Sequence, residues 1–186
     1  MELTTFDVVP EEKDLWERML GGINEKYVGV EIGCLYGDSA KVILGCSPYI
    51  TLISIDPFIP DSIEVSLIGS EEISREKNKE FGTRFQLINN YSWNVVQSFK
   101  DNSLDFLFID GDHRFHSVLV DYTSWEPKIK KGGLLFIHDS RMYRPNNPSN
   151  FHEGPSLVNT KVILPNENLW KLEDEAFTLT CVRKLI

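Results

Sequence analysis

Short apolar runs recur along the chain, and glycine, acidic or amide residues follow most of them. The runs at 27–32, 51–55, 85–88 and 134–137, and the one that begins at Leu104, contain few polar residues. Runs of this kind are typical of strands that helices cover on both faces. The pattern therefore predicts an α/β fold built on a parallel sheet.

Most stretches between these runs have helical spacing of apolar residues or carry residues typical of helix ends. Asp38 and Ser39 are expected to cap one helix and Ser92 another. Near the end of the chain, 168–171 and 177–184 are predicted to form an antiparallel hairpin that turns across 173–175. Helices are predicted from Pro10 to Gly21, at 40–45, 71–81, 93–99, around 118–125 and at 155–162.

The length of 186 residues suits one domain with a full α/β core. We expect a single domain over 1–186, in which 1–26 supplies a helix that covers the sheet. Two segments lack a hydrophobic period and are expected to be loops. The first, 58–70, could lie over a cofactor, whereas 141–155 is either a substrate loop or a plain connection.

Charge and composition exclude several classes of function. The 28 acidic residues outnumber the 19 basic ones, giving a net charge of -9, so we expect no nucleic-acid partner. The three cysteines form no CxxC pair, and the sequence shows no secretion signal and no apolar run long enough to cross a bilayer. These features predict a cytoplasmic protein with no membrane partner.

A glycine-containing stretch, YVGVEIGCLYGDS at 27–39, joins the first strand to a helix. Gly33 and Gly37 would let a ligand approach the backbone, although a tight turn alone also requires glycine. Leu35 stands where a dinucleotide-binding GxGxxG loop has its middle glycine. Glu31 would repel a pyrophosphate but could attract a cationic amino group.

This ExGxxxG pattern resembles the first motif of class I methyltransferases that depend on S-adenosylmethionine (SAM). The resemblance implies that Glu31, Gly33, Gly37 and Ser39 bind the cofactor. Asp56, at the end of the second strand, would accept hydrogen bonds from the ribose hydroxyls, unless it is an ordinary turn residue before proline.

The third strand is followed by Asn90 and Ser92. In the methyltransferase layout this strand end lies beside the adenine, so both residues are predicted to contact the cofactor. The alternative for Ser92 is that it only caps the following helix.

A second motif covers the fourth and fifth strands. The motif IDGDHxFxxVxxDxxxWxPxIxxGGxxxxHD ends at Asp139. It resembles a group of class I methyltransferases, the small-domain enzymes similar to macrocin-type sugar O-methyltransferases. The similarity extends from Val28 to about Asp139. It implies a Rossmann-like, mostly parallel sheet of seven strands with helices on both faces and a C-terminal antiparallel hairpin.

In that group, acids after the fourth and fifth strands bind a divalent metal, usually Mg²⁺. By resemblance the ligands are Asp110, His138 and Asp139, but His138 replaces an acid. Magnesium prefers oxygen ligands, whereas imidazole suits transition metals.

The same residues suggest a reaction. Asp110 would hold a metal or orient the acceptor, and His113 would be the general base, although His113 could instead cap the adenine. Asp110 and His113 are therefore predicted both as catalytic and as cofactor-binding residues.

The sequence thus predicts SAM-dependent O-methylation of a small molecule such as a sugar or secondary metabolite, and a homodimer is expected as the assembly. One alternative is a protein that binds SAM without turnover. Another is a metal-dependent hydrolase built on Asp110, Asp112, His113, His116, His138 and Asp139.

Overall fold

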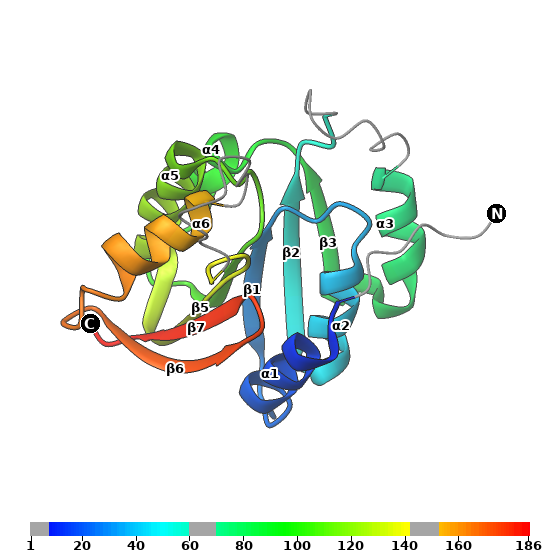
Figure 1. Cartoon of the computed structure of the whole chain (residues 1–186). Helices are drawn as coiled ribbons and strands as arrows, with labels where there is room; N and C mark the ends of the chain where they lie inside the picture. The colour runs from blue at the N-terminus through cyan, green and yellow to red at the C-terminus, as the bar shows by residue number, and fades with distance from the viewer. Residues whose placement is uncertain (1–7, 60–69, 142–152) are drawn as a thin grey trace.

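A seven-stranded sheet runs through the molecule in the order β3-β2-β1-β4-β5-β7-β6 (Figure 1). The computed structural model describes residues 8–59, 70–141 and 153–186. Its strands are β1 (Tyr27–Ile32), β2 (Ile50–Asp56), β3 (Phe85–Asn89), β4 (Leu104–Ile109), β5 (Ile129–Ile137), β6 (Trp170–Ala176) and β7 (Leu179–Lys184).

The first five strands are parallel to their neighbours, and β7 lies antiparallel between β5 and β6. The strand order reverses between β1 and β4, where open α/β sheets bind ligands beyond the carboxyl ends. The predicted Rossmann-like sheet with its C-terminal hairpin is therefore confirmed.

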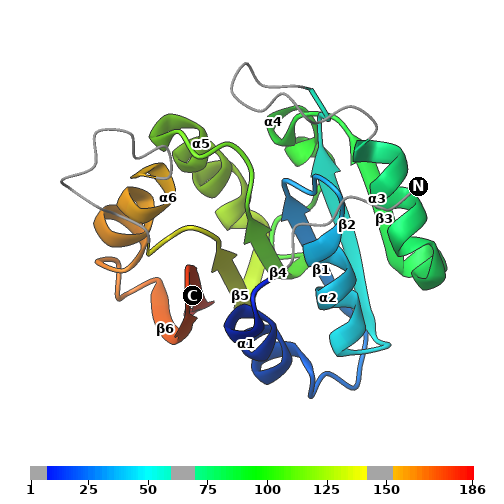
Figure 2. The ribbon, with the colours of Figure 1, turned by 45° about the vertical axis from the view of Figure 1, so that its right-hand side comes forward.

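Helices cover both faces of the sheet, with α1 (Pro10–Leu20) and α2 (Asp38–Cys46) on one face and α5 (Phe115–Trp125) and α6 (Glu153–Val158) on the other (Figure 2). The fold also contains α3 (Ser70–Asn78) and α4 (Ser92–Val95). Short 3₁₀ segments η1 (Lys79–Arg84), η2 (Val96–Ser98) and η3 (Glu126–Lys128) follow α3, α4 and α5, and a π-helical turn, η4 (Asn159–Ile163), follows α6.

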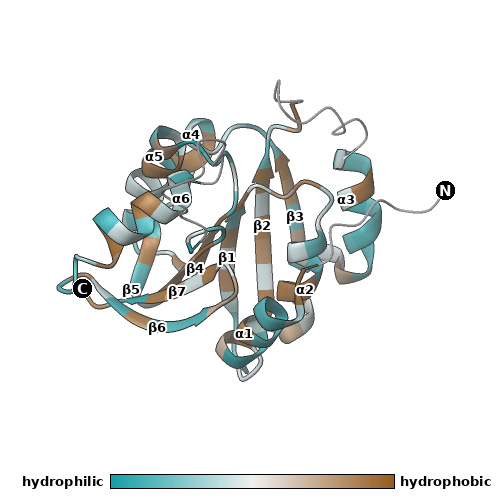
Figure 3. Cartoon of the chain, viewed as in Figure 1, coloured by the Kyte–Doolittle hydropathy of each residue, from teal (hydrophilic) through white to brown (hydrophobic). Residues whose placement is uncertain are grey.

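Each face of the sheet has its own apolar core. One core contains buried residues of α5 and α6, among them Val118, Trp125 and Val158. The other contains residues of α1 and α2, including Trp16 and Ile43. Figure 3 shows hydrophobic residues along the central strands. Because successive residues of a strand point to opposite faces, these strands contribute side chains to both cores. No helix in the described ranges is long and apolar enough to cross a membrane.

The hairpin turns later than the sequence predicts. The acids at 173–175 lie inside β6, and the chain turns at Phe177, whose φ is 49°. Cations hold these acids along the edge strand: Arg18 pairs with Asp174 at 2.7 Å, and Arg183 pairs with Glu173 at 3.1 Å. These ion pairs compensate the charges of Asp174 and Glu173, so both acids can lie within a strand instead of in a turn.

The predicted serine and aspartate caps are also wrong. Gly37, with φ of 75°, is the N-cap of α2, and Tyr91 is the N-cap of α4. Asp38 pairs instead with Lys77 at 2.6 Å, while the hydroxyls of Ser39 and Ser92 bind buried carboxylates.

We predict that Gly29→Ala destabilises the protein by about 1–3 kcal/mol, because it overpacks the core. A β-carbon on Gly29 would lie 2.1 Å from Cζ of Phe106, which is fully buried on the neighbouring strand. Urea denaturation measures the change in the free energy of unfolding.

Gly45→Ala is the matched control. Its β-carbon would meet nothing within 4 Å, and alanine is favoured over glycine in a helix by about 1 kcal/mol. Equal stability of Gly29→Ala and the wild type would contradict the close packing of β1 against β4.

Candidate active site

The segments that follow β1, β2, β4 and β5 meet at one edge of the sheet. The amide of Gly33 donates to the carbonyl of Ile55 at 3.0 Å, and that of Asp110 donates to the carbonyl of Ile32 at 2.8 Å. The amide of His138 donates to the carbonyl of Ile109 at 3.1 Å. These bonds extend the parallel ladder past the strand ends, so the polar residues there lie side by side.

The two glycines of the loop after β1 are required by the chain's own packing. Gly33 has φ of 87°, and a β-carbon there would lie 2.1 Å from the carbonyl oxygen of Asp110. Gly37 has φ of 75°, and its β-carbon would lie 2.4 Å from Nδ2 of Asn78 on α3. The turn interpretation therefore has direct structural support, while the predicted cofactor contact of these glycines stays a prediction.

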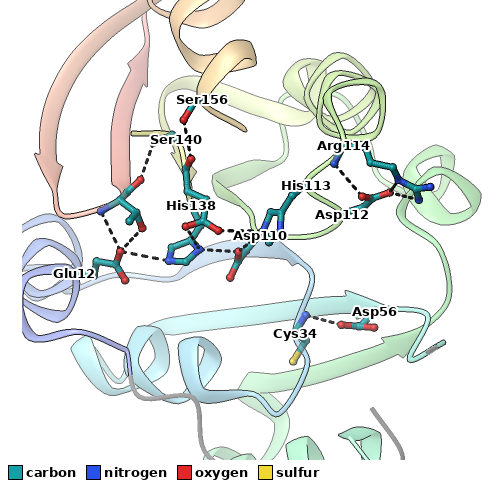
Figure 4. A network of polar contacts seen from close by, with 12 residues as sticks. Glu12, Cys34, Asp56, Asp110, Asp112, His113, Arg114, His138, Ser140 and Ser156 are labelled. Atoms are coloured by element: carbon teal, nitrogen blue, oxygen red, sulfur yellow. Dashed lines mark hydrogen bonds and ion pairs between the residues drawn. The ribbon is translucent and has the colours of Figure 1, made fainter. Parts of the chain in front are cut away.

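Asp56 holds this loop at the end of β2. Its Oδ2 accepts a hydrogen bond from the amide of Cys34 at 2.8 Å (Figure 4) and another from the amide of Leu35 at 2.9 Å. Its Oδ1 accepts from the amide of Phe58 at 2.7 Å. Each carboxylate oxygen can accept two hydrogen bonds, so Oδ1 keeps the capacity for a ligand hydroxyl.

Glu31 lies beneath the loop and is fully buried. Its two carboxyl oxygens accept from the hydroxyls of Ser39 and Ser54, each at 2.5 Å. Burial raises the pKa of Glu31 to about 7, although the serine hydroxyls oppose this change. Through these hydrogen bonds Glu31 links β1 to α2 and to β2. Its attraction for a cationic amino group stays a prediction.

Asn90 and Ser92, the two residues predicted to contact the adenine, lie in different surroundings. Asn90 lies next to the end of β2, where its amide donates to the carbonyl of Asp56 at 3.1 Å. Ser92 is buried, and its hydroxyl donates to Asp121 of α5. Ser92 thus ties the end of β3 to α5, whereas Asn90 stands at the same edge as the glycine loop.

A cluster of carboxylates and imidazoles lies beyond β4 and β5 (Figure 4). Nδ1 of His138 is 2.9 Å from Oδ1 of Asp110 and 3.7 Å from Oδ1 of Asp139. Nε2 of His138 is 3.3 Å from Oε1 of Glu12 on α1. The ring therefore lies between acids from different elements.

These contacts shift the pKa values in opposite directions. Burial alone would lower the pKa of His138, but Asp110 and Glu12 outweigh it and raise that pKa to about 11. Burial alone would raise the pKa of Asp110, but the imidazoles beside it hold it well below its usual range. At neutral pH the pair is therefore an imidazolium and a carboxylate.

His113 is the second imidazole of the cluster. Its Nε2 is 3.3 Å from Oδ2 of Asp139 and 3.8 Å from Oδ1 of Asp110. Burial alone would lower the pKa of His113, and the charge of His138 acts in the same direction, but Asp110 and Asp139 raise it above its ordinary value.

Other parts of the fold hold the segment after β5. Asp139 has φ of 51°, a left-handed conformation that is uncommon outside glycine but that aspartate adopts more readily than most residues. The hydroxyl of Ser156 on α6 donates to the carbonyl of Asp139 at 3.1 Å. The hydroxyl of Ser140 is 2.7 Å from Oγ1 of Thr180 on β7. The C-terminal hairpin and α6 thus fix the orientation of the site.

Asp112 and His116, which the hydrolase alternative includes in the cluster, make contacts elsewhere or are exposed. Asp112 accepts hydrogen bonds from the amide of Arg114 at 3.0 Å and the hydroxyl of Ser117 at 2.7 Å, so it stabilises the start of α5. His116 is exposed on that helix. The predicted loops 58–70 and 141–155 fall largely on 60–69 and 142–152, which lie outside the described residues.

Sequence reasoning missed Glu12. Its side chain is buried and accepts a hydrogen bond from the hydroxyl of Thr178 at 2.6 Å. The available signal was its position, because Glu12 precedes the buried Leu15 and Trp16 by three and four residues and shares their face of α1.

The predicted metal ligands do not fit a divalent ion in this arrangement. Magnesium requires several oxygen ligands around one point. Within 8–59, 70–141 and 153–186, no three His, Cys, Asp or Glu side chains are grouped to hold a metal ion. The ring nitrogens of His138 lie 2.9 Å from Asp110 and 3.3 Å from Glu12.

Solved structures with this fold include O-methyltransferases. TomG from Streptomyces achromogenes, an O-methyltransferase of tomaymycin synthesis solved with SAM, matches with a TM-score of 0.70 and 12% identity, over 97% of this chain and 82% of TomG. The O-methyltransferase from Bacillus cereus, solved with SAH, matches with a TM-score of 0.70 and 16% identity, over 98% of this chain and 84% of that one. At such identities the similarity establishes the fold.

Comparisons of sequence identify the family. The chain is 30% identical over 122 residues, 62% of its length, to the uncharacterized protein R132 of Acanthamoeba polyphaga mimivirus. It spans about half of that viral protein, 52% of its length. The family model described as a methyltransferase domain matches residues 30–140, from β1 to the end of the site. Because this match covers more than half of the chain, the chain belongs to the methyltransferase domain family.

Proposed function

We propose that the protein is a SAM-dependent methyltransferase that methylates an oxygen atom of a small molecule. The observation that carries the proposal is the shared edge of the sheet. There the loop held by Asp56 lies next to Asp110, whose carbonyl oxygen packs against Gly33. This edge includes the reversal of strand order between β1 and β4, where α/β folds bind cofactors.

The cofactor would lie across the ends of β1, β2 and β3. Oδ1 of Asp56 has capacity for a ribose hydroxyl, and Asn90 stands beside it for the adenine. The loop after β1 would lie along the methionine part. SAM and SAH are bound by the O-methyltransferases of S. achromogenes and B. cereus that share this fold, which supports the assignment.

Methyl transfer requires the acceptor oxygen, the methyl carbon and the sulfur to be close and collinear. A lone pair of the oxygen forms the new O–C bond, and the electrons of the C–S bond return to sulfur, which leaves SAH. The hydroxyl proton would pass to the imidazole of His113. Asp139, at 3.3 Å from Nε2, would stabilise the resulting imidazolium, and Asp110 would orient the acceptor hydroxyl.

The acceptor is proposed as a small molecule, such as a sugar or a secondary metabolite. The net charge of -9 disfavours binding to the phosphate backbone of a nucleic acid. Membership of the methyltransferase domain family favours this function over the metal-dependent hydrolase. A homodimer and a cytoplasmic location stay predictions.

We predict that Asp56→Ala weakens SAM binding by about 10- to 100-fold, because it removes a charged acceptor of hydrogen bonds from the ribose and from the loop. Isothermal titration of metal-stripped protein with SAM, and with NAD for comparison, measures the loss. Asp101→Ala is the control, because Asp101 is an exposed acid at the opposite end of β4. Absence of SAM binding to the wild type would contradict the proposed function.

We predict that the rate of methyl transfer rises with pH through an inflection above 6.5, because His113 must lose its proton to act as a base and its neighbours raise its pKa. The pH profile of kcat/KM is measured with an acceptor found by screening small hydroxyl compounds for SAH formation. His113→Gln should lower kcat by about 100-fold or more and remove the inflection.

His116→Gln is the matched control, since it makes the same change at an exposed position on α5. A full rate with an unchanged pH profile in His113→Gln would exclude His113 as the base. SAM affinity is measured in parallel, because a loss of binding instead of turnover would assign His113 to the adenine.

A further inference from the structure

His138 is surrounded by carboxylates that come from separate parts of the fold (Figure 4). Asp110 follows β4, Glu12 belongs to α1, and Asp139 is the next residue in the chain. The shortest distances are 2.9 Å from Nδ1 to Asp110 and 3.3 Å from Nε2 to Glu12. A concentration of acids like this one would normally attract a cation.

The geometry around the ring determines where its protons are. An ionised carboxylate accepts hydrogen bonds and does not donate them, so a ring nitrogen that faces one carries a proton. Nδ1 lies 2.9 Å from Asp110 and Nε2 lies 3.3 Å from Glu12, so a proton on each nitrogen would make both contacts attractive. Such a ring is a cation, and neither nitrogen has a lone pair in the ring plane to give to a metal.

We propose that the active site works without a divalent metal, and that the ring of His138 is the cation that compensates Asp110, Asp139 and Glu12. This inference rests on the proposed methyltransferase function and specifies its mechanism. His138 keeps Asp110 ionised and oriented beside the glycine loop without a metal. Activation of the acceptor then depends on the imidazole of His113 and its neighbour Asp139.

Glu12 is a positioning residue in this arrangement. Its Oε1 accepts a hydrogen bond from the hydroxyl of Thr178 at 2.6 Å. This contact fixes the carboxylate between α1 and the hairpin turn, from where it reaches Nε2 of His138. The covering helix therefore contributes a charge to the site as well as apolar packing.

The test compares Mn²⁺ binding by the wild type, His138→Asp and His116→Asp, all stripped of metal. Electron paramagnetic resonance measures the loss of the free Mn²⁺ spectrum as protein is added. His138→Asp exchanges the cation for an oxygen ligand beside Asp110, Asp139 and Glu12, so we expect it to bind Mn²⁺ at least about tenfold more tightly than the wild type. His116→Asp makes the same change on the exposed face of α5 and should bind like the wild type.

Wild-type protein that binds Mn²⁺ as tightly as His138→Asp, and loses it in Asp110→Asn, would overturn the proposal. So would a folded His138→Asp that binds no better than His116→Asp. If His138→Asp does not fold, His138→Asn removes the same cation and supplies a neutral oxygen, and the same increase over the control is required of it.

Titration of the same samples with SAM separates this inference from the function on which it rests. SAM binding by wild-type protein that takes up no Mn²⁺ supports both proposals. Mn²⁺ uptake at Asp110 together with SAM binding would leave the methyltransferase function intact and overturn the metal-free mechanism. Absence of SAM binding would remove the function itself.

Discussion

The ion pairs of His138 connect elements that are far apart in the sequence. Its ring lies 2.9 Å from Asp110 and 3.3 Å from Glu12, so β5 is linked both to the loop after β4 and to the first helix. Removing one partner of such a pair leaves a partly buried charge without compensation, which is destabilising. The orientation of Asp110, and therefore of the side of the site that would meet an acceptor, depends on this histidine.

The cofactor side of the site depends on a different constraint, which is the close approach of backbones. Asp56 accepts hydrogen bonds from the amides of Cys34 and Leu35 at 2.8 and 2.9 Å. Gly33 lets the same loop pack against the carbonyl of Asp110. This contact joins the two halves of the proposed site. A change in the conformation of the loop would therefore displace Asp110 at the end of β4.

Sequence patterns predicted the sheet well because the burial of its strands follows from local apolar runs. They also showed acidic or amide residues after most of the strands, and parallel strands bring such residues to one side of the sheet. The predicted helix caps were wrong because the hydroxyls of Ser39 and Ser92 donate to the buried carboxylates of Glu31 and Asp121 instead of capping a helix. Glu12 was missed because its partner Thr178 is 166 residues away, a contact that no local pattern encodes. The roles predicted for individual site residues stay predictions.

A crystal structure of the protein with SAH would test the proposed site most directly. We expect a ribose hydroxyl to bind Oδ1 of Asp56, the adenine to lie beside Asn90, and the sulfur to face Asp110 and His113. A nucleoside bound away from the ends of β1 and β2, with Asp56 in contact only with its own loop, would contradict the proposed site.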